Sequence, residues 1–375
     1  MTQHFISPVN AVTPQGILKN VSITVNEGKI VSVLPCPHLS NEPLPWAVPA
    51  FIDLHIHGAG GFGPEQGTMQ SLLDMSAVLA RQAVAAFCPT LYCAHPAKLA
   101  DLLHNLVPAL GKETGAKIIG FHLEGPFISP LKPGVMKPQD IAPANLEDFK
   151  QIYEAAQGHI SIVTLAPEIP HIEPVIQFCL DHHITVQAGH TNATYEQMQH
   201  AFDLGVRRVT HFGNAMSGLH QRAPGVVGAV LNNPQISCEV IADGKHIHPA
   251  LLTLLKRVKP IAQITAVTDA LRPTGQPSGP FYANGEEVIL QEGLWKRKQD
   301  GVTAGSALTL AGAFFQLCQA GYTPQEAAIC TGTNAAKLLG LPAPQLAPGA
   351  VANFVLLDVN ATPKVIFLNG KLIKI

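Results

Sequence analysis

Five short apolar stretches of this 375-residue chain each end in a residue that can bind a metal ion or move a proton. In chain order these residues are His55 with His57, Glu124, His190, His211 and Asp269. Imidazole and carboxylate groups are the usual protein ligands of a catalytic zinc ion. Their repeated position after an apolar stretch therefore suggests one shared metal site rather than unrelated residues.

The stretches before these residues are short and rich in β-branched or small side chains, as buried parallel strands are. They are residues 50–54, 118–123, 184–188, 208–210 and 264–268. Residues 86–91, 161–165 and 235–241 share this composition, and helical patterns such as 69–85 and 144–156 separate most of the eight. Alternating strands and helices favour either a closed barrel or an open doubly wound sheet. Because barrels carry their chemistry at the C-terminal ends of the strands, we predict an α/β fold with a (β/α)8 TIM-like barrel.

Both ends of the chain are predicted to be β-rich. Residues 16–33 alternate apolar and polar side chains on both sides of Asn26-Glu27-Gly28-Lys29, which is typical of a hairpin with one buried face. Near the other end, Asn369-Gly370 between apolar stretches predicts a type I′ turn. Since neither set of hairpins would be stable alone, we expect residues 1–48 and 346–375 to form one small β-sandwich domain, with the barrel in residues 49–345.

Composition and charge restrict the kind of partner. Hydrophobic residues make up 47% of the chain and charged ones 13%, which favours a compact globular body. A formal net charge of −2 offers no electrostatic footprint for nucleic acid or an anionic membrane, so we expect a small-molecule substrate. The N-terminus lacks a basic start before an apolar stretch, and no stretch approaches the roughly 20 apolar residues of a membrane span. We therefore expect a cytoplasmic protein.

Glu124, His190 and His211 form the candidate metal set. A carboxylate at the end of an apolar strand is costly to desolvate unless it is paired or bound to metal. One carboxylate with two imidazoles is a recognised catalytic zinc set, which leaves a fourth position for water. His55 and His57 stand two apart on a presumed strand, so both side chains project from one face and could also grip a metal ion.

Asp269 is the candidate acid and base. It would be the last carboxylate of the barrel and could reach both the metal water and the scissile group. A metal can lower the pKa of its bound water from about 15.7 to about 7. We therefore expect Asp269 to take the water proton and return it to a leaving amine.

Two loops look suited to hold substrate, and a third to cover the site. Arg222 stands on a loop bounded by Gly and Pro, where a guanidinium could make bidentate contact with phosphate. His246, in Asp243-Gly244-Lys245-His246, follows the seventh strand and would lie on the same rim. Residues 271–284, dense in Pro and Gly, predict a long loop on the ligand side of the barrel.

Several motifs along the barrel carry a resemblance to a known family. They are His122-Leu123-Glu124-Gly125-Pro126-Phe127, Gly189-His190-Thr191-Asn192-Ala193-Thr194, Thr210-His211 with Asn214-Ala215-Met216, Arg222 with Pro224-Gly225, Ala242-Asp243-Gly244-Lys245-His246 and Thr268-Asp269-Ala270. In these motifs and their order the chain resembles the N-acetylglucosamine-6-phosphate deacetylase family of the amidohydrolase superfamily. The β-rich ends fit the small second domain of that family, so the resemblance spans nearly the whole chain.

The resemblance implies hydrolysis of the acetamide of an N-acetylhexosamine 6-phosphate to acetate and the amino sugar phosphate. The one carboxylate and two imidazoles would hold the metal, with Asp269 as acid and base. Some members of the family keep His-x-His at the first strand and can hold a second metal. Since this chain has His55 and His57, two ions are an open alternative to the one tightly held zinc ion that we expect.

The resemblance also implies substrate contacts and an oligomer. Asn214, the backbone at Ala215 and His246 would contact sugar and phosphate. Arg222 corresponds to a phosphate-binding Arg that reaches into the active site of the neighbouring subunit. We therefore expect a homodimer in which Arg222 completes the partner site.

Met136 departs from the family pattern. After Glu124-Gly125-Pro126 the family usually has Lys-Gly-Ala-His, whose His contacts the acyl group, and Met136 stands where that His is expected. A thioether cannot donate a hydrogen bond to a carbonyl or a developing oxyanion. Another donor or a second metal must replace the His, or the substrate differs. Galactosamine stereochemistry is therefore an alternative to glucosamine.

Other functions remain as competing hypotheses. Relatives that bridge two metals with a carboxylated Lys are disfavoured, because strand four ends in Thr164-Leu165-Ala166-Pro167. A barrel kept as a non-catalytic scaffold is the alternative of another class. Such scaffolds usually lose metal ligands or the strand-eight Asp, and this chain has all of them.

Overall fold

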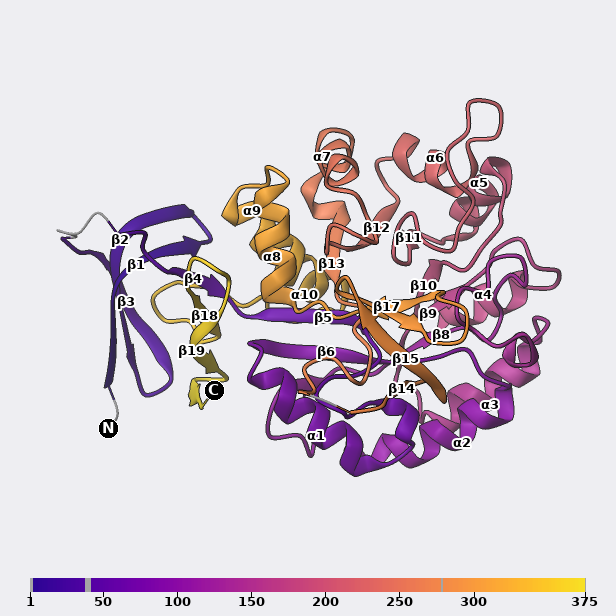
Figure 1. Ribbon diagram of the computed structural model, residues 1–375, viewed down its shortest axis with the longest axis horizontal. Coiled ribbons are helices and arrows are strands. Elements are labelled where there is room, and N and C mark those ends of the chain that lie inside the picture. The colour runs from indigo at the N-terminus through magenta and orange to yellow at the C-terminus, as the bar shows by residue number, and fades with distance from the viewer. Residues whose placement is uncertain (1–2, 38–41, 278, 375) are drawn as a thin grey trace.

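The computed structural model describes residues 3–37, 42–277 and 279–374. Figure 1 shows a large α/β body and, beside it, a smaller domain of strands in which both described ends of the chain lie. Residues 38–41 and residue 278, which fall inside the predicted small domain and the predicted cover loop, lie outside the described residues.

All eight predicted barrel strands form, and neighbouring strands are parallel. They are β5 (Phe51–Ile56), β6 (Val84–Leu91), β8 (Phe121–Glu124), β9 (Ile160–Leu165), β10 (Thr185–Ala188), β11 (Arg208–Val209), β12 (Ser237–Ile241) and β13 (Ile264–Val267), and a short β7 (Lys117–Ile118) pairs with β6. The two outer strands meet where the amide of Asp269 donates to the carbonyl of His55 at 2.8 Å and that of His57 donates to Ala270 at 2.9 Å. These bonds close the sheet, so the barrel prediction is confirmed over the open sheet.

Helices cover the outside of the barrel, with α1 to α3 along one side and α5 to α7 along the other (Figure 1). They are α1 (Met69–Ala80), α2 (Pro96–Leu106), α3 (Leu146–Ala155), α4 (Glu173–Asp181), α5 (Tyr195–Leu204), α6 (Gly225–Asn232), α7 (Pro249–Val258) and α8 (Leu310–Gln319), with 3-10 turns at Pro64–Gln66, Val107–Ala109, Pro138–Asp140 and Ile261–Gln263. Leu72, Met75 and Leu79 of α1 are fully buried in the core that also contains Phe51 and Phe87. Apolar residues at this spacing give a helix one buried face.

One predicted helix is shorter in the structure, and one helical segment is interrupted. The helix expected at 69–85 ends at Ala80, because Ala83 has a positive φ of 63° and the chain then enters β6. Near the end of the barrel, the helical segment is divided into α9 (Pro324–Ala328), a π-helical turn (Ile329–Thr333) and α10 (Asn334–Leu338). Beside the π turn, the Asn334 side chain donates to the carbonyls of Ile261 and Ile264, which ties this helix to the base of β13.

The small domain is one seven-stranded sheet made from both ends of the chain. Its strands, in spatial order, are β20 (Lys371–Ile373), β19 (Pro363–Leu368), β18 (Phe354–Leu357), β4 (Trp46–Pro49), β1 (Gln3–Thr13), β2 (Gly16–Asn26) and β3 (Lys29–Pro35). Ile23 and Val25 of β2 share a buried core with Phe354 and Phe367, so the two halves of the sheet face each other as a sandwich does. The predicted domain of both termini is thus confirmed, while its boundaries at residues 48 and 346 stay a prediction.

A second, four-stranded antiparallel sheet is inserted between β13 and α8. It consists of β14 (Phe281–Ala283), β15 (Glu286–Gln291), β16 (Leu294–Arg297) and β17 (Thr303–Ser306). The predicted loop at 271–284 is therefore wrong in its last residues, because Phe281 packs edge-on against Trp295 with ring centroids 5.0 Å apart. A buried cluster that includes Trp295, Leu271 and Met136 joins this sheet to the barrel rim.

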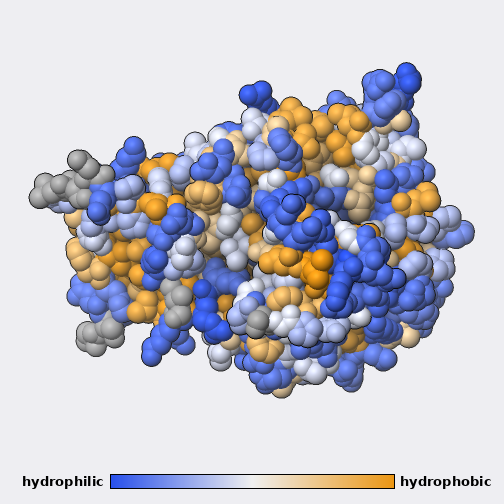
Figure 2. All heavy atoms as spheres, viewed as in Figure 1, coloured by the Kyte–Doolittle hydropathy of each residue, from blue (hydrophilic) through white to orange (hydrophobic). Residues whose placement is uncertain are grey.

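The surface is mixed in character, and the cysteines form no disulfide bonds among the described residues. Hydrophilic and hydrophobic residues are interspersed over the face shown in Figure 2. Among the residues that the structure describes, no helix combines the length and apolar character needed to cross a bilayer. All seven cysteines are free thiols, and five of them are buried.

Candidate metal centre and active site

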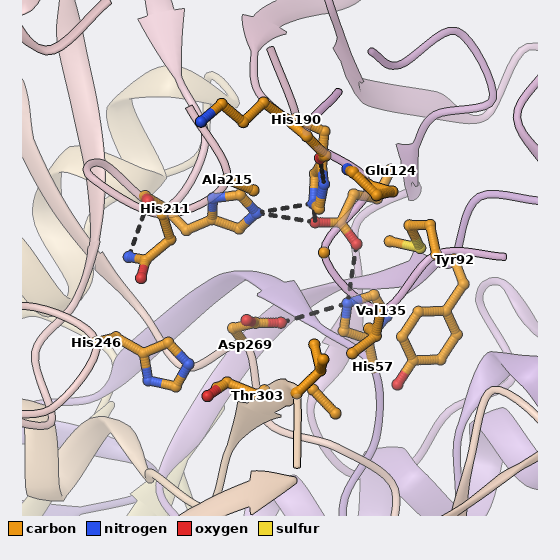
Figure 3. A pocket seen from close by; sticks show the side chains of 18 of the residues that line it. His57, Tyr92, Glu124, Val135, His190, His211, Ala215, His246, Asp269 and Thr303 are labelled. Carbon is orange, nitrogen blue, oxygen red and sulfur yellow. Dashed lines mark hydrogen bonds and ion pairs between the residues drawn. The ribbon is translucent and has the colours of Figure 1, made fainter. Parts of the chain in front are cut away.

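The residues predicted at the strand ends converge at the C-terminal rim of the barrel, and Figure 3 labels all of them except His55. Three of them, His190, His211 and Asp269, have positive φ angles of 45°, 29° and 49°. The left-handed region is uncommon for residues other than glycine and costs on the order of 1–3 kcal/mol each. The chain thus turns sharply just after the strand, which directs each side chain into the mouth of the barrel.

Glu124, His190 and His211 form a compact first group. Glu124 Oε1 lies 3.0 Å from Nε2 of His190 and 3.1 Å from Nε2 of His211, and the two nitrogens are 3.2 Å apart. Bonds of about 2.0–2.1 Å from a tetrahedral zinc ion place its ligand atoms about 3.3 Å from one another. The three atoms therefore lie close to the positions that one such ion needs.

His55, His57 and Asp269 form a second group beside the first. Oδ1 of Asp269 lies 3.5 Å from Nε2 of His55 and 3.3 Å from Nε2 of His57. Glu124 faces both groups, because its Oε2 is 3.2 Å from Nε2 of His57. Nε2 of His55 is buried and has no hydrogen-bond partner among the described residues, which fits a nitrogen that binds a cation.

The groups around the candidate ligands fix the orientation of their imidazole rings. Nδ1 of His57 lies 3.1 Å from the carbonyl of Thr90, and Nδ1 of His190 lies 2.9 Å from the carbonyl of Lys132. Backbone acceptors of this kind set the tautomer of a ligating imidazole. Gly134 permits the contact with His190, since its φ is 57° and a Cβ there would lie 3.1 Å from Cε1 of that ring.

Asp53, which the sequence reading did not single out, joins the two strands at the closure of the barrel. Its Oδ2 accepts from the hydroxyl of Thr268 at 2.6 Å, and its Oδ1 accepts from the amides of His55 and Thr268 at 3.3 Å. Burial raises the pKa of Asp53 to about 7, although these hydrogen bonds oppose the shift. An acid inside an apolar stretch, two residues before a candidate ligand, was the available signal.

The electrostatics of the two groups favour a bound cation. Burial opposes a charge on His55, but the charges of Glu124, Asp269 and a further buried carboxylate raise its pKa to about 10. Burial likewise opposes a charge on Glu124, yet the neighbouring imidazoles hold its pKa well below the usual value. The carboxylates thus attract positive charge strongly, and a divalent cation can supply it in place of protons.

A cavity of about 420 Å³ opens onto both groups. His57, Glu124, His190, His211 and Asp269 line it, together with the predicted substrate residues Asn214, Ala215, His246 and Met136. β17 supplies another part of the wall through residues 303–305. The inserted sheet therefore has the covering position that the sequence assigned to a loop.

His246 is held rigidly at the rim of this cavity. Its Nδ1 lies 2.6 Å from Oδ2 of Asp243, and its amide donates to Oδ1 of the same residue. Burial lowers the pKa of His246, but the hydrogen bond and the charge of Asp243 outweigh it and raise the pKa above the usual value. His246 thus keeps a proton to higher pH than a free imidazole does.

Met136 and Arg222 occupy contrasting positions. Met136 is 3% exposed and packs with Tyr92, whose ring stacks on that of His57 at a centroid distance of 3.8 Å. Arg222 is exposed on the loop before α6 and does not line the cavity of its own chain. The structure therefore brings the predicted site residues to the cavity wall except His55, which is fully buried beside the second group, and Arg222, whose role across a dimer stays a prediction.

Besides Asp53, two more residues that were not predicted from the sequence contact the site. Tyr92 stacks on His57, and Glu239 of β12 lies against His55 with 3.4 Å between Oε2 and Nδ1. Tyr92 follows β6 directly, so its position after a barrel strand was a usable signal. Glu239 stands inside its strand and carried no such signal.

Comparisons with known proteins agree with this geometry. The amidohydrolase family profile matches residues 46–373. N-acetylgalactosamine-6-phosphate deacetylase of Escherichia coli O157:H7 is 30% identical over 98% of this chain and 99% of its own, and N-acetylglucosamine-6-phosphate deacetylase of Bacillus subtilis is 33% identical over 90% and 88%. Among solved structures, a variant of N-acetyl-D-glucosamine-6-phosphate deacetylase from Mycobacterium smegmatis, in complex with N-acetyl-D-glucosamine 6-phosphate, superposes with a TM-score of 0.89 at 25% identity over 100% of both chains. The Thermotoga maritima N-acetylglucosamine-6-phosphate deacetylase gives 0.86 at 28% identity over 99% of both.

Proposed function

The chain belongs to the amidohydrolase family and, within it, to the N-acetylglucosamine-6-phosphate deacetylases, and from this premise we propose that it hydrolyses the acetamide of N-acetylglucosamine 6-phosphate. The products are acetate and glucosamine 6-phosphate. One observation carries the proposal: Oε1 of Glu124 and the Nε2 atoms of His190 and His211 lie within 3.2 Å of one another. They face a cavity that Asp269 also lines. A metal-dependent hydrolase of this family needs such a ligand set beside a proton-transfer group.

The first group would hold a zinc ion, and the second group, with Glu124 between the two, fits a further divalent ion. A divalent cation bound there polarises an amide carbonyl and lowers the pKa of a coordinated water. Glu124 and the histidines keep their ligand atoms inside the barrel mouth, where the surrounding strands exclude bulk water. Low exposure strengthens every charge interaction in the site.

Asp269 is the proton carrier in this proposal. Figure 3 shows it between His57 and His246, in the wall of the cavity. Burial opposes its charge, but the hydrogen bond from His57 and the neighbouring imidazoles keep its pKa below the usual value, so it is ionised at neutral pH. An ionised carboxylate can accept the proton of the attacking water and then protonate the leaving amine of the sugar.

The sugar phosphate would be held by the part of the cavity rim that contains His246. The contact with Asp243 favours the protonated form of His246, which can bind a phosphate or a hydroxyl group, and Asn214 and the backbone at Ala215 line the same cavity. Arg222 from a second copy would complete the phosphate site. The homodimer and the cytoplasmic location remain predictions, and the molar mass in solution tests the first.

The galacto epimer is the second candidate substrate. The relative from Escherichia coli O157:H7 that acts on N-acetylgalactosamine 6-phosphate aligns with nearly the whole chain. Met136 also stands where the resemblance leads us to expect a hydrogen-bond donor, so the pocket differs from the usual one. Both observations favour testing the two epimers together.

Acetate release from the two N-acetylhexosamine 6-phosphates, by protein reconstituted with Zn²⁺, tests the proposal. We expect turnover with at least one epimer, and much weaker turnover with the sugar that lacks phosphate. Metal-stripped protein should be inactive and recover on addition of Zn²⁺. If the reconstituted protein releases no acetate from either epimer and retains no metal, the proposed function is wrong and the result supports the non-catalytic scaffold instead.

A further inference from the structure

The candidate ligand histidines differ in what holds their second nitrogen. Backbone carbonyls hold Nδ1 of His57 and of His190, and Nδ1 of His211 has no partner among the described residues. Nδ1 of His55 instead faces the Oε2 of Glu239 at 3.4 Å. Within this set, only His55 is backed by a carboxylate.

Glu239 is placed to orient His55 rather than to bind a cation. It lies on β12 and is fully buried; one of its oxygens faces Nδ1, while the other is 3.8 Å from Nη2 of Arg208. A cation-binding imidazole carries its proton on the nitrogen away from the ion, so Nδ1–H of His55 would donate to Glu239. Nε2 is then the unprotonated nitrogen, and it faces Glu124 and Asp269.

The surroundings of Glu239 show a site built around this contact. Arg208, itself buried, is fixed by Gln187 at 2.8 Å and by Ser237 at 3.1 Å, and it turns its remaining nitrogen towards Glu239. Burying a carboxylate costs several kcal/mol unless partners compensate for the loss of water. A chain of polar groups from Gln187 through Arg208 to Glu239 therefore crosses the barrel interior and ends at His55.

The charge of Glu239 also matters to the second group. Glu124 alone supplies the carboxylate of the first group, whereas the second shares Glu124 and adds Asp269. Two neighbouring divalent ions repel each other, so additional negative charge nearby favours binding of the second one. Glu239 lies one imidazole away from the second position, where its charge increases the basicity of His55.

We propose that Glu239 is a positioning residue that fixes the imidazole of His55 and thereby determines whether a second cation binds at His55, His57 and Asp269. The inference rests on the metal centre proposed above. It assigns the first group no dependence on Glu239, because neither oxygen of that carboxylate contacts His190 or His211.

The test uses the full chain, stripped with a chelator and titrated with Zn²⁺ and, separately, with Co²⁺. Bound metal is counted by elemental analysis, and the visible spectrum of Co²⁺ distinguishes the two environments. Because the structure places two groups of buried candidate ligands side by side, we expect two ions per chain in the parent, rather than the single ion expected from the sequence. In Glu239→Gln we expect one ion of parental affinity and a second bound about 10–100-fold more weakly, with loss of the matching Co²⁺ bands.

Matched variants separate positioning from a general structural effect. Thr265→Val changes a buried residue that lies opposite Glu239 in the next strand and whose hydroxyl has no partner among the described residues, so it should keep both ions. His55→Ala should lose the second ion, and adding Glu239→Gln to it should cause no further loss. If Glu239→Gln alone does not fold, Arg208→Met with Glu239→Gln removes both members of the buried pair and tests the same contact.

The outcomes are distinguishable from failure of the proposed function. Parental affinity for both ions in Glu239→Gln would overturn the inference, and so would a parent chain that binds one ion only. Absence of acetate release from either sugar phosphate would overturn the proposed substrate and leave the metal titration as it stands.

Discussion

The two candidate cation positions are built differently although they share Glu124. In the first group the three ligand atoms lie 3.0–3.2 Å apart, and the second nitrogen of His190 is held by a backbone carbonyl. In the second group the distances to Asp269 are 3.3 and 3.5 Å, and His55 depends on a buried carboxylate from another strand. The first position thus follows from the ends of the strands, whereas the second also needs the barrel interior.

This difference allows cation binding and proton transfer to be tested separately. The first group contains candidate ligands only, but the second includes Asp269, which would also carry the proton in the proposed reaction. A change at the first group should remove the ion on which turnover depends. A change at the second should preserve one ion while it alters the catalytic step.

Glu124→Gln should have the largest effect, because this carboxylate faces both groups. We expect both ions to bind far more weakly and kcat to fall by at least about 10⁴-fold, since metal stabilisation of the transition state amounts to several kcal/mol. Metal content after gel filtration and acetate release measure the two effects. A variant that kept two ions would show that Glu124 does not join the groups.

Asp269→Asn should distinguish the contributions of the two groups. We expect kcat to fall by about 10²–10⁴-fold, as for loss of a general acid and base, while the first group keeps its zinc and the sugar phosphate still binds. Single-turnover kinetics and isothermal titration with the substrate measure these quantities. Full activity in this variant would remove Asp269 from the mechanism.

Arg222→Ala should leave both groups intact and weaken substrate capture. Loss of a charge-assisted contact of about 1.5–3 kcal/mol raises KM for the phosphorylated sugar by roughly 10–100-fold with little change in kcat. Zinc content provides the control, since it should equal that of the parent. Equal activity of the parent on the sugar without phosphate would contradict the role given to Arg222.

His246 belongs to neither group of candidate metal ligands, and the pH dependence of KM should report its protonation. Its pKa is raised, so the charged form that attracts phosphate is present below that pKa and is lost as pH rises through it. KM for the phosphorylated sugar should therefore increase at alkaline pH. Asp243→Asn removes the partner that raises the pKa of His246, so the increase in KM should begin at lower pH. At a fixed pH within this range, KM of the variant should be a few-fold higher than that of the parent.

The sugar without phosphate is the control for that profile. Its KM should be nearly constant over the same pH range, because it lacks the anion that His246 would bind. The same alkaline increase for both sugars would assign the titration to another group.

The strand-end residues could be predicted because the signal for them is local. An apolar stretch followed by His or an acid marks each one, and a closed parallel barrel brings all such ends together. Glu239 is an acid inside the short strand Ser237–Ile241, but unlike Asp53 it has no candidate metal ligand two residues away, so the local sequence does not indicate what it contacts. Its meaning comes from contact with His55, which is 184 residues away in sequence.

The inserted sheet was missed for a related reason. Its strands are short, and β15 carries mostly exposed or half-buried residues, so the sequence lacks a strong alternating pattern there. The sheet is stabilised by distant partners instead. Trp295 is buried against Met136, Leu271 and the Tyr92 region of the barrel rim, which no local pattern could reveal.

One hydrogen bond at the barrel closure has a consequence for solution measurements. The amide of Asp269 donates to the carbonyl of His55, so the backbone joins the two residues whose side chains would share an ion. Exchange of that amide with deuterated solvent requires the strands to part locally, and a cation gripped from both sides opposes parting. Deuterium uptake at this single position, followed by mass spectrometry, should therefore slow when the protein is loaded with metal.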